Sequence, residues 1–338
     1  MTRQSPNRGD TVVRSFEDSR FPGRKSISFG FPVTSLFYQW LLLYRNKLGA
    51  MQQSNRRQFL RSSVGLVALG SLPFLRLAAK PGPLAGKIRI AVKYHMIDEP
   101  SLNIVEKFRL LKEIGFDGVE VKTDHAADTS EFVTAIGETG LPVHGVIHSS
   151  KPNIAGAVKF ANQLGGDSVL VLASEDPKIS YDENFRLWQG RVHEAVAIAE
   201  KSGIHLCIEN VRATFLKTGE EMARFIDSFD SPFVRSYFDL GNTITWTEQL
   251  AEHWAKALGS RIYKLDIKDR GHREFGDAKL KLDGITTGTD GGEVNWANVR
   301  EELDRVSFSG WATAEVAGGD RKRLAGIAGW MRDVLDLV

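Results

Sequence analysis

From residue 87 to the end of the chain, short apolar runs alternate with longer segments in which apolar residues recur at helical spacing. Short runs of this kind, bounded by turn residues, are typical of buried parallel strands. We predict strands at residues 88–92, 117–121, 142–148, 168–172, 203–209, 233–239, 261–267 and 310–316. We predict helices at residues 101–114, 129–139, 153–164, 183–202, 218–229, 246–258, 296–306 and 320–335.

The regular alternation of strands and helices favours a closed barrel over an open doubly wound sheet. The first strand is followed by Lys93-Tyr-His95 rather than by a glycine-rich turn, so a dinucleotide-binding fingerprint is absent. Residues 87–338 also match the roughly 250 residues typical of one barrel. The sequence therefore predicts an α/β fold, a (β/α)8 TIM barrel over residues 87–338.

Four consecutive predicted strands end on or next to a carboxylate. These acids are Glu209, Asp239, Asp266 and Glu315. Side chains alternate along a strand, and the apolar face must meet the helices, so each acid should point into the barrel. The C-terminal ends of barrel strands meet at one mouth, where the acids should converge. We expect them to bind one divalent metal ion.

Each acid taken singly is better explained as a helix cap or as half of an ion pair. Four acids at equivalent positions weaken that explanation. Buried like charges without a counter-ion would cost several kcal/mol, on the order expected for uncompensated charges. The pattern therefore favours a metal centre over four unrelated ion pairs.

The same residues resemble the strand-end motifs of the xylose-isomerase-like family of sugar and sugar-phosphate isomerases and epimerases. The matching segments are Glu209-Asn210, Asp239-Leu-Gly-Asn242, Asp266-Ile-Lys-Asp269 and Glu315. The resemblance implies a TIM barrel whose four acids bind one metal ion, with Glu209 and Glu315 as catalytic proton-transfer groups. It implies a metal-dependent isomerase or epimerase of a sugar or keto-sugar that works through a metal-stabilised enediolate.

Asp266 departs from the family pattern, which has histidine at this position. Four acids around one divalent ion leave two excess negative charges, and Lys264 and Lys268 on the same strand face would offset part of them. Oxygen ligands favour Mn²⁺ or Mg²⁺ over Zn²⁺, with Co²⁺ as a further candidate cofactor. The alternative is that the ion is lost and Asp266 pairs with Lys264.

Several polar residues near the predicted strand ends are candidates for contact with a sugar. They are Asn242, Lys268, Glu120, Lys122, His148 and Glu175, with His272 and Arg273 in the long connection between residues 269 and 293. A connection of that length is usually functional, and we expect it to cover the substrate. His144, His205 and Cys207 are instead expected to be interior structural residues.

The residues before 87 contain a segment that resembles a twin-arginine export signal. Arg56-Arg57 is followed by Phe59-Leu60 and by an apolar run, residues 62–75, that is too short for a comfortable membrane span. We expect residues 51–86 to be signal and linker, without a stable membrane span, and residues 1–50 to be an upstream extension with no folded role. The protein would engage the twin-arginine export machinery and work in the periplasm or cell envelope.

Composition narrows the remaining choices of function. A net charge of +2, with basic residues scattered among acids, gives no argument for nucleic-acid binding. Two other functions stay open: a dehydratase or lyase that uses the same metal centre, and a barrel that binds sugar without catalysis. The sequence does not identify the sugar, and it leaves open whether the barrel forms a homo-oligomer.

Overall fold

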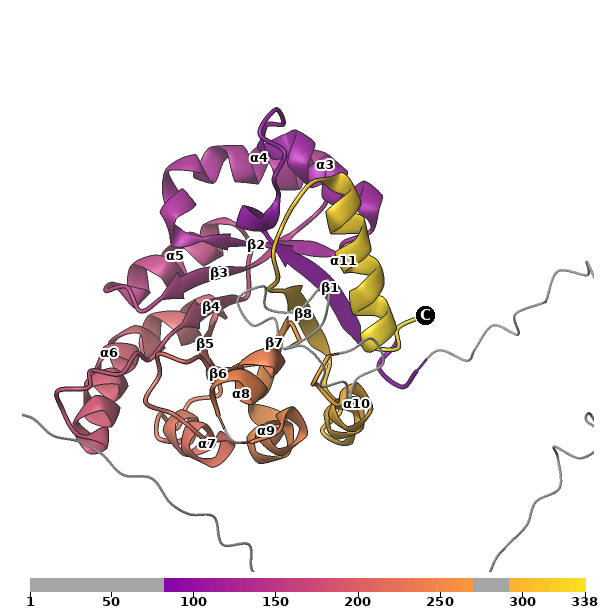
Figure 1. Ribbon diagram of the computed structural model, residues 1–338. Coiled ribbons are helices and arrows are strands. Elements are labelled where there is room, and N and C mark those ends of the chain that lie inside the picture. The colour runs from indigo at the N-terminus through magenta and orange to yellow at the C-terminus, as the bar shows by residue number, and fades with distance from the viewer. Residues whose placement is uncertain (1–81, 248, 270–291) are drawn as a thin grey trace, which may run out of the picture. The chain divides into compact units, whose positions relative to one another are not determined.

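The computed structural model describes residues 82–247, 249–269 and 292–338. Within these ranges eight parallel strands form a closed barrel, in which each strand pairs with the next and the last pairs with the first. The strands are β1 (Ile88–Lys93), β2 (Gly118–Lys122), β3 (Val143–Ser149), β4 (Ser168–Val171), β5 (His205–Glu209), β6 (Val234–Asp239), β7 (Ile262–Ile267) and β8 (Gly310–Ala314). The prediction of a (β/α)8 barrel is confirmed (Figure 1).

Helices surround the strands and cover their outer faces (Figure 1). They are α3 (Ile104–Ile114), α4 (Thr129–Thr139), α5 (Ile154–Gln163), α6 (Tyr181–Ser202), α7 (Gly219–Asp227), α8 (Leu240–Trp246), α9 (Ala251–Leu258), α10 (Trp296–Arg305) and α11 (Arg321–Val334). The last helix, α11, packs against α3 and β1, so the end of the chain completes the ring next to its first strand.

Polar caps explain where several helices begin. Asn103, Ser180 and Thr218 each accept a hydrogen bond from a backbone N–H three residues on, and a glutamate there reaches back to the cap. The cap of α3 is Asn103 rather than Ser101, where the sequence prediction began this helix. Asn103 takes that place because its side chain is the one that meets the Glu106 N–H, at 3.0 Å.

The chain after β6 differs from the prediction of one helix at residues 246–258. The structure has two helices there, α8 and α9. The first starts directly at the strand end, because Asp239 Oδ1 accepts the Asn242 N–H at 2.9 Å and so caps α8. The hydrophobic pattern missed this helix because the same few residues end the strand, cap the helix and carry the acid.

The barrel interior is more polar than the branched apolar packing usual for this fold. The main hydrophobic core lies between the strands and the helices, and a second, small apolar cluster lies on the inner strand faces. This second cluster consists of Ile147, Leu170, Cys207 and Tyr237. Glu120, Lys264 and Thr313 are also fully buried. Cys207 is the expected buried thiol, and burial raises its pKa.

Some of the sequence predictions fall outside the described residues. The predicted extension and export signal lie in residues 1–81, and His272 and Arg273 lie in residues 270–291. These stay predictions. Among the helices that the structure describes, none combines the length and the apolar character needed to cross a bilayer.

Candidate metal centre

The four predicted acids lie together at the C-terminal mouth of the barrel. Glu209 and Asp239 end β5 and β6. Asp266 stands opposite Asp239 in the register of β6 and β7, and Glu315 directly follows β8. One carboxylate oxygen from each acid lies within 4.8 Å of the other three. A hard divalent cation at about 2.0–2.6 Å from each oxygen fits a set of this size.

Two lysines contact the acids from either side. Lys93, the last residue of β1, lies 2.9 Å from Asp266 Oδ2 and 2.9 Å from Glu315 Oε1. Lys268, the residue after β7, lies 2.8 Å from Asp239 Oδ2 and 3.0 Å from Glu315 Oε2. Two ammonium groups balance half the charge of four carboxylates. With all four acids ionised, two negative charges are left over, and one divalent ion would balance them.

Two of the acids have oxygen atoms without a partner among the described residues. Glu209, only 8% exposed, makes no hydrogen bond or ion pair within that part of the chain. Asp266 Oδ1 is also buried without a hydrogen-bond partner there. Buried carboxylate oxygens normally have a donor or a cation beside them. The donor set therefore fits a divalent ion, which Glu209, Asp239, Asp266 and Glu315 would hold.

The two glutamates at the mouth differ in proton affinity. Burial and the neighbouring Glu315 carboxylate raise the pKa of Glu209 to about 8. Burial also acts to raise the pKa of Glu315, but Lys93 and Lys268 outweigh it and hold this pKa well below its usual range. In the metal-free protein the two glutamates therefore differ in proton affinity, with Glu209 the more basic carboxylate and Glu315 the more acidic one.

Two asparagines fix the position of Asp239. The Asn210 side chain donates to the Asp239 carbonyl at 2.7 Å and accepts the Asp239 N–H at 2.8 Å. Asn242 Nδ2 donates to the Asn210 carbonyl at 2.8 Å, and the Trp246 indole N–H donates to Asn242 Oδ1 at 3.1 Å. Asn242, predicted to contact substrate, thus uses its side chain to link β5 and β6.

Below the acids, a chain of hydrogen bonds crosses the barrel interior from Lys264 to Glu120. Lys264 Nζ lies 2.8 Å from His144 Nδ1, and His144 Nε2 lies 3.2 Å from Thr313 Oγ1. The Tyr237 hydroxyl lies 2.9 Å from Thr313 Oγ1 and 3.2 Å from Glu120 Oε2. An ammonium only donates, so His144 accepts at Nδ1 and donates from Nε2. A carboxylate only accepts, so the phenol proton points to Glu120 and Thr313 donates to the phenol oxygen.

These hydrogen bonds give Lys264 and Glu120 roles that differ from those predicted from the sequence. Lys264 also pairs with Asp167 at 2.5 Å, and Asp266 pairs with Lys93, so the alternative of an Asp266–Lys264 pair is wrong. His144 forms interior hydrogen bonds, as expected. Glu120 is 0% exposed, a position that suits support of the acids from below better than contact with a sugar.

The other predicted substrate residues are spread around the mouth. Lys122 ends β2 and is half-buried. His148 has both ring nitrogens engaged, at 3.3 Å from Thr123 Oγ1 and 3.0 Å from the Pro152 carbonyl. Glu175 is exposed and pairs with Lys217 at 2.9 Å. Of these three, Lys122 is the one whose side chain makes no hydrogen bond or ion pair within the described part of the chain, which keeps it available to a substrate.

Two residues that the sequence analysis did not select also belong to the mouth. Lys93 ends β1 on the same inner face as the acids, and His95 follows it and is exposed. Burial, together with Lys122 and Lys93, lowers the pKa of His95 to about 4, so its imidazole is neutral at pH 7. The alternation that located the acids also applies to Lys93 and would have placed it inward.

Asp269 holds the chain where it returns from the long connection after β7. Its carboxylate accepts the N–H groups of Glu293 and Val294 at 2.8 and 2.9 Å and the indole N–H of Trp296 at 2.9 Å. Gly292 lies against the same carboxylate, so close that a Cβ there would come within 1.9 Å of Asp269 Oδ2. Glycine is therefore required at this position.

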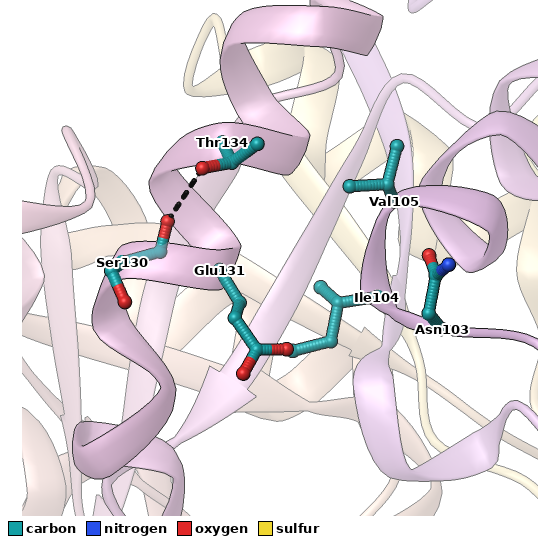
Figure 2. A pocket seen from close by; sticks show the side chains of 6 residues that line it. All are labelled: Asn103, Ile104, Val105, Ser130, Glu131 and Thr134. Atoms are coloured by element: carbon teal, nitrogen blue, oxygen red, sulfur yellow. Dashed lines mark hydrogen bonds between the residues drawn. The ribbon is translucent and has the colours of Figure 1, made fainter.

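A hollow of about 340 Å³ lies elsewhere, outside the barrel between the first turns of α3 and α4 (Figure 2). Its lining residues are Asn103, Ile104, Val105, Ser130, Glu131 and Thr134. Asn103 is engaged as the cap of α3, and the Thr134 hydroxyl donates to the Ser130 carbonyl at 2.9 Å. With one acid and no cluster of ligands, this hollow offers no rival to the mouth.

Known proteins resemble this chain in sequence and in architecture. A sequence model of the family described as Xylose isomerase-like TIM barrel matches residues 108–334. L-ribulose-5-phosphate 3-epimerase UlaE of Escherichia coli O1:K1 / APEC is 23% identical over 195 residues, which cover 49% of this chain and 68% of that protein.

Solved structures agree with the family match. The 3-keto-D-glucoside 4-epimerase YcjR from E. coli has a TM-score of 0.60 and 19% identity, covering 73% of this chain and 100% of its own. The IolI protein, whose crystal structure holds a zinc atom, has a TM-score of 0.59 and 15% identity, with coverages of 73% and 98%. At such identities the structures show the shared fold. Since the family model spans most of the barrel, this chain belongs to the xylose isomerase-like TIM barrel family.

Proposed function

We propose that this barrel is a divalent-metal-dependent epimerase or isomerase of a sugar that carries a carbonyl group. The observation that carries the proposal is the convergence of Glu209, Asp239, Asp266 and Glu315 within 4.8 Å, with unfilled oxygens on two of them. The sugar epimerases UlaE and YcjR, which resemble this chain, support the substrate class.

Glu209 and Glu315 are the proposed proton-transfer pair. Glu315, whose carboxylate Lys93 keeps ionised, removes the proton beside the carbonyl, and Glu209 carries the proton on the other side of the substrate. Return of the proton to the same carbon inverts its configuration, whereas transfer to the neighbouring carbon exchanges aldose and ketose. A bound divalent ion supplies Lewis-acid stabilisation of the charge that develops on the carbonyl oxygen.

The proposed cofactor is Mn²⁺ or Mg²⁺, with Co²⁺ as a further candidate. All four donors are carboxylate oxygens, which these hard ions prefer, whereas Zn²⁺ more often takes nitrogen or sulfur ligands. The zinc atom in IolI shows that a member of this fold can hold that ion. Metal analysis of the protein purified with each ion would rank them.

Three side chains at the rim are proposed to contact the sugar. His95 is exposed and uncharged at pH 7, and Lys122 is half-buried beside it. Trp246 is 36% exposed, with the Arg212 guanidinium 4.9 Å from its ring centroid. An aromatic face next to polar donors suits a ring that has apolar C–H groups and many hydroxyls.

Proton–deuterium exchange into a panel of ketoses and keto-sugars, with Mn²⁺ added, tests the proposal. Glu209→Gln and Glu315→Gln should each reduce exchange by about 10²–10⁴-fold, the usual contribution of a positioned acid or base. Glu138→Gln, a change in an exposed ion pair between α3 and α4, should leave exchange unaltered. Full exchange in both active-site variants would remove the proposed acid–base pair.

The same experiment separates the competing functions. A dehydratase or lyase would release water or cleave the substrate under these conditions, which mass spectrometry of the products would detect. A sugar-binding barrel without catalysis would bind ligand and show no exchange in the unmodified protein. Epimer or isomer formation with solvent deuterium incorporated is the outcome that the proposal requires.

We also propose that the barrel is exported by the twin-arginine route, on the evidence of Arg56-Arg57 and the short apolar run that follows. The double variant Arg56→Lys, Arg57→Lys should keep the precursor in the cytoplasm. Cell fractionation and N-terminal sequencing measure this directly. A native protein that starts at residue 1 and stays in the cytoplasm would contradict the proposal.

A further inference from the structure

The two lysines at the mouth, Lys93 and Lys268, differ in how deeply their side chains are buried. Lys93 projects from the last position of β1 and its side chain is 3% exposed. Lys268 lies just beyond the end of β7 and its side chain is 12% exposed. A residue inside a strand of a closed barrel cannot move without disturbing its neighbours, whereas one beyond the strand end has more freedom.

The carboxylate oxygens are unequally occupied. Glu315 has an ammonium group on each oxygen, Lys93 on Oε1 and Lys268 on Oε2. Asp239 Oδ1 accepts the Asn242 N–H, and Asp239 Oδ2 forms an ion pair with Lys268 at 2.8 Å although it accepts no hydrogen bond from the described residues. Both oxygens of each of these two acids therefore have a donor or a cation beside them while Lys268 stays in place.

Removal of one lysine would open the site and removal of the other would not. Withdrawal of Lys268 frees an oxygen on Asp239 and one on Glu315. Withdrawal of Lys93 also frees an oxygen on Glu315, but its other oxygen is on Asp266, whose Oδ1 already lacks a partner among the described residues, and Asp239 stays occupied by Lys268. The lysine that blocks the site is thus also the more exposed one.

We propose that Lys268 is an internal cation that a divalent ion displaces from Asp239 and Glu315, while Lys93 stays in place as a permanent counter-charge. This inference rests on the proposed metal centre and adds how the centre is loaded. Mutual repulsion drives the exchange, because an ammonium group and a divalent ion cannot share the same oxygens at close range. The displaced ammonium then lies at the mouth, where a sugar oxygen can accept its hydrogen bonds.

The position of Lys268 in the metal-free protein depends on Gly241. A Cβ on Gly241 would lie 2.5 Å from Lys268 Cγ, so the lysine stem packs directly on this glycine. The stem therefore lies over the start of α8 and brings the ammonium to Asp239, the cap of that helix. The ammonium end of Lys268 is held by its ion pairs with Asp239 and Glu315, so an ion that takes over those oxygens releases it.

Trace acetylation of the unmodified full chain with acetic anhydride tests the exchange without any mutation. Mass spectrometry would measure the acetylated fraction of each lysine in the metal-stripped protein and in the protein saturated with Mn²⁺. Calorimetry would establish that saturation has been reached. Lys268 should become several-fold more reactive with Mn²⁺, while Lys93 stays protected and the exposed Lys217 serves as the unchanged control. Unchanged or lower reactivity of Lys268 at saturation would overturn the inference.

A second test uses Lys268→Met with Lys217→Met as the matched control. The Lys268 variant should bind Mn²⁺ at least about tenfold more tightly by calorimetry, because no ammonium has to leave. Its metal-free form should melt at a lower temperature than the unmodified protein and regain stability with Mn²⁺. Equal or weaker binding by this variant overturns the exchange alone, whereas failure of the unmodified protein to bind any divalent ion overturns the proposed metal centre with it.

Discussion

The barrel contains two polar layers that look alike in composition and differ in the balance of charge. In the lower layer, donors and acceptors run in one direction from Lys264 through His144, Thr313 and Tyr237 to Glu120, although Glu120 Oε1 has no hydrogen-bond partner among the described residues. At the mouth, four carboxylates meet two ammonium groups. The mouth therefore has the larger excess of negative charge, and within the described part of the chain its acids are the ones close enough together to share a cation.

The difference teaches how a buried charged group can be recognised as structural or functional. In the lower layer Lys264 lies beside Asp167 at one end and Glu120 lies at the other, and neutral groups carry the hydrogen bonds between them. Four carboxylates with oxygens within 4.8 Å of one another, against two ammonium groups, mark the mouth as the place where a cation binds. Burial alone does not distinguish the two layers, because both contain buried charged residues.

The largest expected effect is the loss of the lysine that anchors the lower layer. Lys264→Met would leave Asp167 and the His144 carbonyl without their buried partner. We expect the free energy of unfolding to fall by about 3–5 kcal/mol, the usual cost of breaking a buried pair, with or without Mn²⁺. Urea denaturation measures it. A loss that Mn²⁺ reverses would show that the two layers are one site, contrary to the comparison.

Metal removal should affect the mouth alone and produce the next largest change. At a free Mn²⁺ concentration about 100-fold above the dissociation constant, binding to the native state adds about 2.7 kcal/mol to the free energy of unfolding. Chelation should remove that gain in the unmodified protein and in Tyr237→Phe alike, because Tyr237 belongs to the lower layer. Denaturation with and without EDTA provides the measurement, and equal stability in the two conditions would count against the metal centre.

Per pH unit, the smallest effect is the pH dependence of the metal-free protein. The pKa of Glu209 is raised to about 8, so between the pKa of the unfolded chain, about 4.3, and pH 8 the native state keeps a proton that the unfolded state has lost. Stability should therefore fall as the pH rises through this window, by at most about 1.4 kcal/mol per pH unit.

Glu209→Gln should flatten this slope, because the amide does not titrate. Denaturation of the metal-stripped protein at pH 5, 6, 7 and 8 would show the trend, and Mn²⁺ should suppress it because a bound ion competes with the proton. A stability that rises with pH over this range would mean that Glu209 is ionised in the metal-free protein.

Sequence patterns located the acids because strand alternation and strand ends are local properties. Glu209, Asp239 and Glu315 each lie at the end of an apolar run, and the barrel brings such ends together. The barrel itself followed from the repeated order of strands and helices. The first turn of α8 was not predicted, because its cap, Asp239, also ends a strand.

The partners of the acids were harder to foresee, because they depend on which strands become neighbours when the barrel closes. Lys93 reaches Glu315 because β1 pairs with β8, although the two residues are far apart in the sequence. Lys264 shares a strand face with Asp266 but lies two residues lower, roughly 7 Å along the strand, and so belongs to the other layer. The spacing along the sequence predicted which strand face each residue occupies, but not how deep in the barrel its side chain lies.

The carboxylate of Asp269 has a consequence for how this scaffold can vary. It fastens the chain at residues 293 and 294 to the end of β7, so the connection after β7 departs from and returns to almost the same point. Insertions or deletions between residues 270 and 291 can then change the length of that connection without shifting Asp266 on its strand. The spacing of the four acids is in this way independent of the length of the connection.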